Sequence, residues 1–189
     1  MNPNIDSSIR RKVLFVGWGR AGKDEAAQFA ESHLGLRYGG SFSWHAKESV
    51  AGALGIHPMT AWETRHQNRQ FWKDHCDALR ADNQTLLAER ALATGDICAG
   101  LRDKVELLAV CSKNLFDWIV WIERPGTPQD FTVTFTADDV LCRVNGFGIL
   151  NDGSLEDYHR KLITFFRRIG QPFPRLSDYA RKLIEEQFA

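Results

Sequence analysis

The sequence lacks three features that would each have placed it in a particular class of protein. No apolar stretch approaches the roughly 20 residues that a membrane span requires. The four cysteines, Cys76, Cys98, Cys111 and Cys142, follow neither a C-x-x-C nor a histidine spacing, so we expect reduced thiols in a cytoplasmic protein rather than a zinc site or a disulfide framework. With 24 basic and 24 acidic side chains, bulk charge indicates no nucleic-acid or membrane partner, although a local basic groove is compatible with it.

The length of 189 residues suits one domain with a substantial core. Residues 1–11 contain no apolar region of the signal-peptide kind, and they predict a short flexible lead-in. The chain contains no internal repeat and no low-complexity segment. We therefore expect a single domain over residues 12–189.

The most informative motif is a candidate phosphate-binding loop. The apolar residues 13–16 predict a buried strand, and Gly17, Gly22 and Lys23 after it match the G-x-x-x-x-G-K spacing. Glycines let backbone N–H groups turn toward a polyphosphate, the next helix adds partial positive charge, and Lys23 supplies a mobile cation. The alternative is a glycine-rich strand–helix turn with a solvated lysine. The predicted nucleotide-binding residues are Gly17, Trp18, Gly19, Arg20, Ala21, Gly22, Lys23, Asp24 and Glu25.

Asp24 stands where this motif usually has a Ser or Thr whose hydroxyl meets Mg²⁺. A carboxylate is a hard oxygen ligand, so Asp24 is the candidate metal ligand. It could equally be a helix N-cap or a first-turn acid that faces the helix dipole. The sequence leaves both roles open.

Strand and helix patterns alternate after this loop, which predicts an α/β fold. Strand patterns cover residues 13–16, 36–42, 96–100, 117–122, 131–135 and 140–144, and a last one precedes the Asn151-Asp152-Gly153 turn. Helical patterns cover residues 45–54, parts of 60–80, 86–92 and 105–110, and a helix N-capped by Ser154 with an apolar stripe. We expect a three-layer fold of the P-loop kinase type, with a mainly parallel sheet of about five strands and helices on both faces.

Two arginines follow predicted strands at the edge where parallel sheets place their ligands. Arg102 comes just beyond the strand 96–100 and could clamp an acceptor phosphate or pair with Glu106. Arg124 ends the next strand and could contact the transferring phosphate or a nucleotide base, or be a surface arginine. Phosphoryl transfer needs cations around the phosphate oxygens, so Lys23, Arg102 and Arg124 are the predicted catalytic residues.

The helical segment around residues 58–94 is the candidate acceptor-binding insertion. Residues 65–80 are richer in arginine and aromatic residues than a routine outer helix. Arginines grip phosphates bidentately and tryptophans stack on bases, although an amphipathic helix with a charged outer face explains the same pattern. His45 follows the second strand, where an acceptor loop would lie. The predicted acceptor-binding residues are His45, Arg65, Arg69, Trp72 and Arg80.

Several stretches resemble bacteriophage deoxynucleoside monophosphate kinases. They are the loop at residues 17–24 with G-K-D, the strand-to-arginine stretch 96–102, the rim 120–125 and the turn 150–155. The resemblance covers most of residues 12–168. It implies a P-loop kinase core that uses ATP and Mg²⁺.

Within this group, residues 69–72, 76–82 and 95–102 look most like a phage branch, the 5-hydroxymethyluracil DNA kinases. That resemblance implies transfer of the γ-phosphate of ATP to the hydroxymethyl group of the base in polymeric DNA. This step of thymidine hypermodification would protect viral DNA from host restriction, in the host cytoplasm. Ordinary nucleotide kinases tend to carry an arginine-bearing lid, whereas residues 125–139 contain no arginine or lysine, which favours the DNA acceptor.

Two other functions stay open at the level of sequence. The first is a soluble deoxynucleoside monophosphate kinase that makes deoxynucleoside diphosphates. The second is a non-catalytic nucleotide-binding module. The chain has no N-K-x-D switch motif, and Arg102 with Arg124 suits group transfer, so the non-catalytic module is the weakest of the three.

Overall fold

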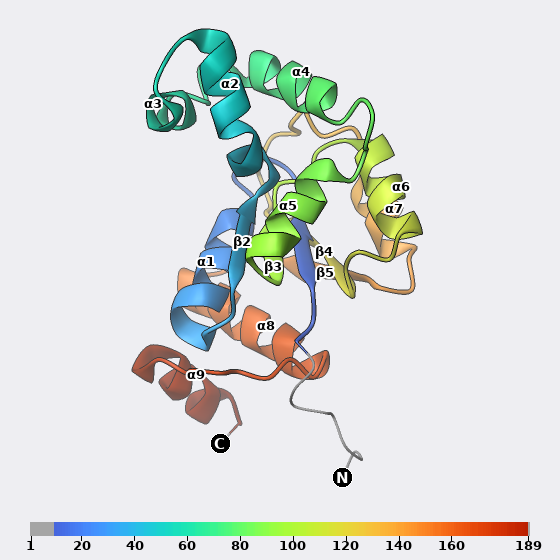
Figure 1. The fold of residues 1–189 in the computed structure, drawn as a ribbon. Coiled ribbons are helices and arrows are strands. Elements are labelled where there is room, and N and C mark those ends of the chain that lie inside the picture. Colours follow the sequence, from blue (N-terminus) through green and yellow to red (C-terminus); the bar gives the residue numbers. More distant parts are fainter. Residues whose placement is uncertain (1–9, 189) are drawn as a thin grey trace.

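The computed structural model of the protein describes residues 10–188 (Figure 1). The flexible lead-in predicted for residues 1–11 lies outside the described residues except for its last two positions. Nη1 of Arg10 lies 3.8 Å from Oδ2 of Asp96, and the backbone N–H of Arg11 donates to Oε1 of Gln171 at 2.7 Å. These two positions are therefore in contact with the folded body.

A five-stranded sheet forms the centre of the fold. Its strands are β1 (Val13–Val16), β2 (Tyr38–Ser41), β3 (Ile97–Ala99), β4 (Trp118–Glu123) and β5 (Gly146–Leu150), in the order β2-β3-β1-β4-β5. All four strand pairs are parallel, so the carboxyl ends of the strands lie at one edge. The central strand β1 is fully buried, as expected of an apolar run that is covered on both faces.

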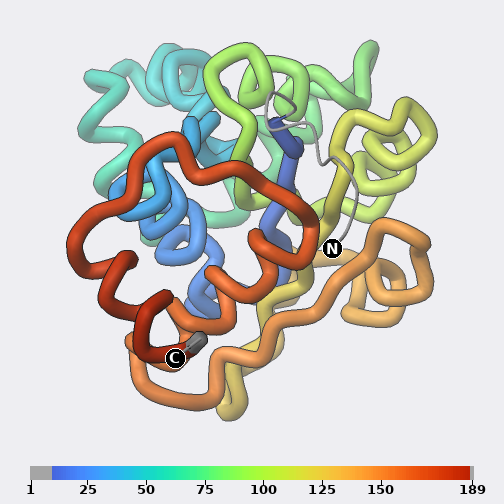
Figure 2. Tube along the Cα trace, turned by 90° about the horizontal axis from the view of Figure 1, so that it is seen from below, coloured from blue at the N-terminus to red at the C-terminus, as the bar shows by residue number. Residues whose placement is uncertain are grey.

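Helices cover both faces of this sheet (Figure 1). Val13 and Phe15 face the first layer, and Leu14 and Val16 face the second. The first layer consists of α1 (Lys23–Leu34), α8 (Leu155–Arg168) and α9 (Asp178–Phe188), and Figure 2 shows the two C-terminal helices beside α1. The second contains the 3₁₀ helix η1 (Phe42–Ala46), α2 (Lys47–Leu54), α3 (Pro58–Glu63), α4 (Arg69–Leu79), α5 (Leu86–Thr94), α6 (Lys104–Ser112) and α7 (Ala137–Leu141). This is the three-layer α/β fold of P-loop kinases, and it confirms the predicted fold class.

The chain between β2 and β3 contains α3, α4 and α5, which lie within residues 58–94. The partly helical pattern of residues 60–80 resolves into two helices with a break at residues 64–68. Pro58 starts α3, and Nδ1 of His57 accepts from the N–H of Met59 at 3.2 Å, so this helix is short and capped. The break allows α4 to begin at Arg69, near the carboxyl edge of the sheet.

Two of the expected strands are wrong. Residues 131–135 form no strand, and residues 140–144 contain the end of α7 and a loop. Thr136 and Asp139 form a capping box, in which the N–H of Thr136 donates to Oδ2 of Asp139 at 2.9 Å, and this box starts α7. Val133, Phe135 and Val140 are still buried against the sheet, and burial alone does not distinguish a strand from a packed loop.

Helix α8 agrees with its prediction. Oγ of Ser154 accepts from the N–H of Asp157 at 3.1 Å, and the carboxylate of Asp157 accepts from the N–H of Ser154 at 3.0 Å. This reciprocal cap fixes the start of the helix. Four members of the predicted apolar stripe, Tyr158, Leu162, Phe165 and Phe166, lie in the core, whereas the fifth, Leu155, is exposed in the first turn. No helix within residues 10–188 is long and apolar enough to cross a membrane.

Candidate functional site

The connection between β1 and α1 has the backbone conformation that a phosphate-binding loop requires. Gly17 and Gly22 have φ of 135° and 110°, values that side-chain-bearing residues rarely adopt. A Cβ at Gly17 would also lie 2.3 Å from the carbonyl oxygen of Ile122 in β4. Both glycines are therefore needed to pack the loop tightly at the end of the central strand.

Side chains from distant parts of the chain hydrogen-bond to two carbonyl oxygens of the loop. Nδ2 of Asn151 donates to the carbonyl oxygen of Ala21 at 3.0 Å, and the hydroxyl of Tyr158 donates to that of Gly22 at 3.0 Å. Among residues 10–188, no acceptor pairs with the backbone N–H groups of Gly22 and Lys23. Unpaired N–H groups at a helix N-terminus are available to donate hydrogen bonds to a bound anion.

Lys23 is the first residue of α1 and its side chain is only 6% exposed. Its Nζ donates to the carbonyl oxygen of Trp18, which turns the ammonium back over the loop. Burial, and then the charge of Arg102, lowers the pKa of Lys23 to about 8. An anionic ligand would therefore stabilise the charged form of Lys23.

We expect the affinity for ATP to depend on the charge of Lys23. Because the pKa of Lys23 is lowered, its ammonium loses the proton as pH rises through about 8. The association constant should then fall, by at most about tenfold per pH unit, because a neutral amine no longer attracts phosphate. Calorimetric titration with ATP from about pH 6 to about pH 10 checks this. Lys23→Arg should move the decline to more alkaline pH, and an association constant in the wild type that does not change above about pH 8 would contradict the prediction.

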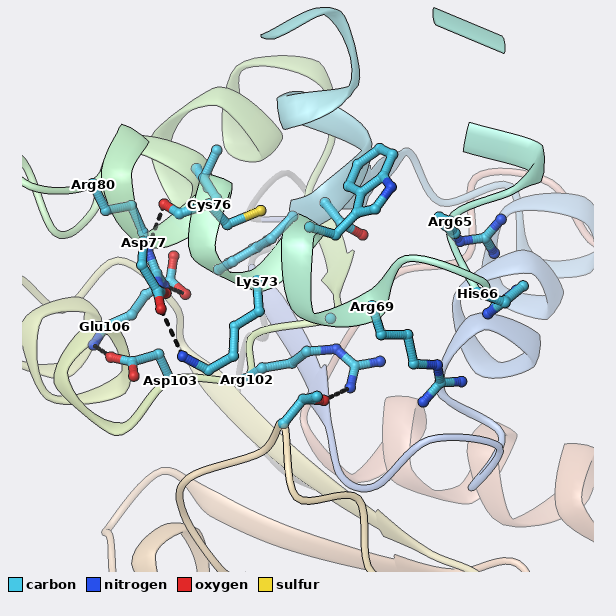
Figure 3. Close-up of a pocket in the computed structure, with 16 residues that line it drawn as sticks. Arg65, His66, Arg69, Lys73, Cys76, Asp77, Arg80, Arg102, Asp103 and Glu106 are labelled. Atoms are coloured by element: carbon cyan, nitrogen blue, oxygen red, sulfur yellow. Dashed lines mark hydrogen bonds and ion pairs between the residues drawn. The ribbon is translucent and has the colours of Figure 1, made fainter. Parts of the chain in front are cut away.

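Arg69 and Arg102 converge beside this loop and share one carboxylate. Nη1 of Arg102 lies 2.6 Å from Oδ2 of Asp130, and Nη1 of Arg69 lies 3.4 Å from the same atom. Figure 3 shows the two arginines next to each other in the cavity. Although burial favours the neutral form, hydrogen bonds from Thr132 and Arg102 bring the pKa of Asp130 down to about 2. Asp130 is therefore a carboxylate at neutral pH.

Asp130 also lies against the loop. A Cβ on Gly19 would come within 2.7 Å of its Oδ2. The sequence identified Arg102 but not this partner, and the alternative pairing of Arg102 with Glu106 is wrong, because Glu106 pairs with Arg80. The carboxylate of Asp130 thus pairs with both arginines beside the phosphate-binding loop.

More cations gather here than this one carboxylate balances. The pKa of His66 is lowered first by burial and then by four arginines, namely Arg65, Arg69, Arg20 and Arg102. Burial, Arg69 and Arg102 also lower the pKa of Arg65, against an opposing effect of Asp24. The overall neutrality of the chain therefore conceals a local basic cluster of Arg20, Arg65, His66, Arg69 and Arg102, the "basic cluster" below.

A cavity of about 100 Å³ opens beside the basic cluster (Figure 3). It is lined by four of the five predicted acceptor-binding residues, Arg65, Arg69, Trp72 and Arg80, together with Arg102. Trp72 is 5% exposed, and its Nε1 has no hydrogen-bond partner among the described residues. The cavity thus combines cations with an aromatic side chain that has a spare donor.

The opposite side of this cavity contains a buried ion pair. Arg80 pairs with Glu106 and also with Asp77, and the side chains of Arg80 and Glu106 are 5% and 2% exposed. Burial raises the pKa of Glu106, and Arg80 opposes that rise. Oε1 of Glu106 has no partner within the described part of the chain. The charge of Arg80 is therefore already neutralised within the protein, which gives it a structural role.

We expect Arg80→Ala to destabilise the fold by about 3–5 kcal/mol, because it leaves Glu106 buried without its cation. Urea unfolding followed by circular dichroism measures this change. The double variant Arg80→Met/Glu106→Leu should recover much of the loss, since an apolar pair of similar volume replaces two buried charges. Arg37→Ala, which removes an exposed arginine, is the control and should change stability little. A loss below about 1 kcal/mol in Arg80→Ala would contradict the structural role.

The remaining predicted residues lie apart from this cavity. His45 hydrogen-bonds through Nε2 to the carbonyl oxygen of Gly39 at 2.6 Å and lines a second cavity of about 450 Å³ with Arg65 and Asp24. Arg124 lies at the carboxyl edge just beyond β4, is exposed, and has no side-chain partner within residues 10–188. The structure therefore brings Lys23, Arg69 and Arg102 together and leaves these two at the periphery.

The structure excludes one of the roles that the sequence left open for Asp24. The N-cap of α1 is Gly22, so the N-cap role for Asp24 is wrong, and Asp24 is an exposed first-turn acid. No group of three or more His, Cys, Asp or Glu side chains within residues 10–188 is arranged to hold a metal ion. A cation at this loop would take one carboxylate from the protein and its other oxygens from phosphate or water.

Sequence reasoning missed Asn151, Tyr158 and Asp130. Asn151 directly follows β5, so its place at the carboxyl end of a parallel strand was a usable signal. Tyr158 was assigned to the apolar stripe of α8, where its ring does lie, but its hydroxyl reaches the loop. Asp130 directly precedes residues 131–135, for which a strand was predicted, and no local spacing marked it.

Neither models of known protein families nor curated protein sequences match this chain. The case for a function therefore rests on the geometry of the site.

Proposed function

We propose that the protein is an ATP-dependent kinase that transfers the γ-phosphate to the hydroxymethyl group of 5-hydroxymethyluracil in DNA. The observation that carries this proposal is the juxtaposition of the phosphate-binding loop and the basic cluster. The loop supplies unpaired N–H groups and the buried Lys23, and Arg102, whose charge lowers the pKa of Lys23, lines the acceptor cavity. Phosphoryl transfer requires this combination of a polyphosphate site, cations at the transferring group and a sheltered acceptor.

The loop suits ATP through its backbone and Lys23. The N–H groups of Gly22 and Lys23 would meet phosphate oxygens, and the ammonium of Lys23 would neutralise charge on the β- and γ-phosphates. Arg102 would meet the equatorial oxygens during transfer. In the reaction the hydroxymethyl oxygen bonds to the γ-phosphorus, the bond to the β-phosphate oxygen breaks, and the hydroxyl proton passes to solvent.

Mg²⁺ fits the loop only as a shared ion. The carboxylate of Asp24 would supply one oxygen, and the phosphates and water would supply the rest, which is the usual arrangement for this ion. When bound, the ion would neutralise phosphate charge.

The cavity beside the loop would take the acceptor base. It is lined by residues of α4 and of the segment that follows β3, and Trp72 offers its ring for apolar contact. Only a base rotated out of the duplex can enter such a site. The basic cluster would then bind the neighbouring DNA phosphates. The product would be an intermediate of thymidine hypermodification that protects viral DNA from host restriction, in the cytoplasm of the host.

A second candidate is a kinase of free deoxynucleoside monophosphates. The arginines Arg65, Arg69 and Arg102 converge on one cavity, and this arrangement also suits the 5′-phosphate of a small nucleotide. The absence of arginine and lysine from residues 125–139 weighs against this candidate, because that segment contributes a carboxylate to the site instead.

Transfer of label from γ-labelled ATP separates these functions. We expect label in duplex DNA that contains 5-hydroxymethyluracil, and none in the same duplex with thymine. Label in added deoxynucleoside monophosphates alone would establish the second candidate. ATP binding without transfer to either acceptor would overturn both, and would leave a non-catalytic nucleotide-binding module.

The role proposed for Asp24 is tested by Asp24→Asn. A neutral amide is the weaker ligand for Mg²⁺, so the concentration of Mg²⁺ at half-maximal activity should rise, by about tenfold or more. Glu31→Gln, at an exposed carboxylate on the same helix, is the matched control and should leave the titration unchanged. An unchanged titration in Asp24→Asn would assign Asp24 to the helix dipole alone.

A further inference from the structure

Phe131 is an apolar side chain that is presented to solvent at the edge of the site. Its side chain is 88% exposed, whereas Val133, two residues further on, is 6% exposed and lies in the core. Single exposed apolar residues are common on protein surfaces. What distinguishes Phe131 is the rigidity of the backbone that carries it, together with its surroundings.

Hydrogen bonds fix the turn on both sides of Phe131. The carboxylate of Asp130 pairs with Arg69 and Arg102, and it also accepts from the N–H of Thr132 at 3.1 Å. The side chain of Thr132 in turn hydrogen-bonds to Arg102. The backbone continues this attachment, since the N–H of Val133 donates to the carbonyl oxygen of Asp130 at 2.9 Å. The phenyl ring therefore projects from an anchored turn.

Two arginines lie close to Phe131. A surface cavity of about 390 Å³ is lined by Phe131 together with Arg20, His66 and Arg69. His66 and Arg69 also line the acceptor cavity, so the two cavities adjoin. Arg20 is exposed, has a φ of 66° and has no side-chain partner within residues 10–188. An apolar ring thus lies beside Arg20 and Arg69, next to the acceptor cavity.

We propose that Phe131 enters the base stack of duplex DNA at the position that the target base vacates. This inference rests on the proposed function, because it requires a DNA base as the acceptor. Removing a base from a duplex breaks its pairing and leaves a gap in the stack. Apolar side chains that enter base steps stabilise such distorted DNA, while nearby arginines bind its phosphates. The anchored turn holds the ring for this role, and Arg20 and Arg69 supply the flanking charge.

Phe131→Ala on two substrates tests the inference. The substrates are an oligonucleotide with one 5-hydroxymethyluracil, either single-stranded or in a duplex. A single strand has no base pairs to break, so its phosphorylation should depend little on the ring of Phe131. We expect kcat/KM on the duplex to fall at least about tenfold, and kcat/KM on the single strand to stay within about twofold. Val144→Ala, which truncates a fully exposed apolar residue after α7, is the control and should leave both values unchanged.

A second measurement does not depend on turnover. In the absence of ATP, 2-aminopurine placed next to the target base should become more fluorescent when wild-type protein unstacks it, and much less so with Phe131→Ala. Equal losses on both substrates would overturn the inference in favour of stacking on the bound nucleotide or base, and no loss on either would overturn it outright. If wild-type protein transfers phosphate to neither DNA, the proposed function fails and the inference fails with it.

Discussion

Lys23→Ala should reduce kcat/KM for ATP about 10²- to 10³-fold while the protein stays folded. The expected loss is that of one preorganised phosphate contact in a water-poor site, about 3–4 kcal/mol in the transition state. Lys23 is suited to this role because its side chain is 6% exposed and its Nζ is turned over the loop. Steady-state kinetics with ATP measure the effect.

Two controls separate charge from folding in this experiment. Lys113→Ala removes a lysine that is about half exposed and caps the C-terminal end of α6, so its kcat/KM should match that of wild type. The thermal unfolding midpoint of Lys23→Ala should lie close to that of wild type, because removing a desolvated cation relieves a burial penalty. Activity of Lys23→Ala within a few-fold of wild type would remove the loop from the reaction.

Arg102→Ala should reduce kcat about 10³-fold or more and affect the dissociation constant of ATP much less. An arginine that meets the transferring phosphoryl group acts mainly in the transition state, and losses of 10³ to 10⁵ are typical of such arginines. Arg102 has the required position, since it follows β3 at the carboxyl edge and its charge lowers the pKa of Lys23. Pre-steady-state kinetics distinguish the loss in transfer from a loss in binding.

The interpretation of Arg102→Ala depends on its partner. Without Arg102, the carboxylate of Asp130 would face the phosphate-binding loop with only Arg69 at 3.4 Å. That less compensated negative charge would oppose the charge that develops on the transferring phosphoryl group, and would enlarge the loss in kcat. The double variant Arg102→Ala/Asp130→Asn removes it, and we expect kcat of the double variant to remain about 10²-fold or more below wild type. Recovery to near wild-type kcat would show that Arg102 serves only to neutralise Asp130.

The parts of the site that the sequence predicted are those encoded locally. The strand, the loop and the start of α1 occupy residues 13–34 without interruption, so the positions of Gly17, Gly22 and Lys23 follow from spacing alone. The place of Arg102 could be predicted for a related reason, because the carboxyl ends of parallel strands meet at one edge. The order of the strands then determined which side chains lie next to one another.

The parts that the sequence did not predict depend on contacts between distant residues. Asp130 lies 28 positions from Arg102 and 61 from Arg69, and Asn151 lies 130 positions from Ala21. No periodic pattern encodes such pairs. The alternation of apolar residues from 131 to 135 even indicated a strand, because a loop packed against a sheet can bury alternate side chains as a strand does.

The same limitation applies to Arg80. Its place in an arginine-rich helical pattern suggested a phosphate ligand, and its residue type was compatible with that role. Its partner, Glu106, lies on α6, and the burial of both side chains follows from how α4 packs over the sheet. Burial decides whether a cation is available to a ligand, and a sequence pattern does not report burial for long polar side chains.

The most direct test is to identify the atom that receives the phosphate. Duplex DNA containing 5-hydroxymethyluracil is incubated with the protein, ATP and Mg²⁺. It is then digested to nucleoside monophosphates by a nuclease without phosphatase, and the nucleotides are separated and identified by mass spectrometry. We predict a deoxyuridine monophosphate that carries an additional phosphate on its 5-hydroxymethyl oxygen, formed by wild-type protein and absent with Lys23→Ala. Recovery of unmodified 5-hydroxymethyldeoxyuridine monophosphate alone, with ATP unconsumed or hydrolysed to ADP and free phosphate, would contradict the account.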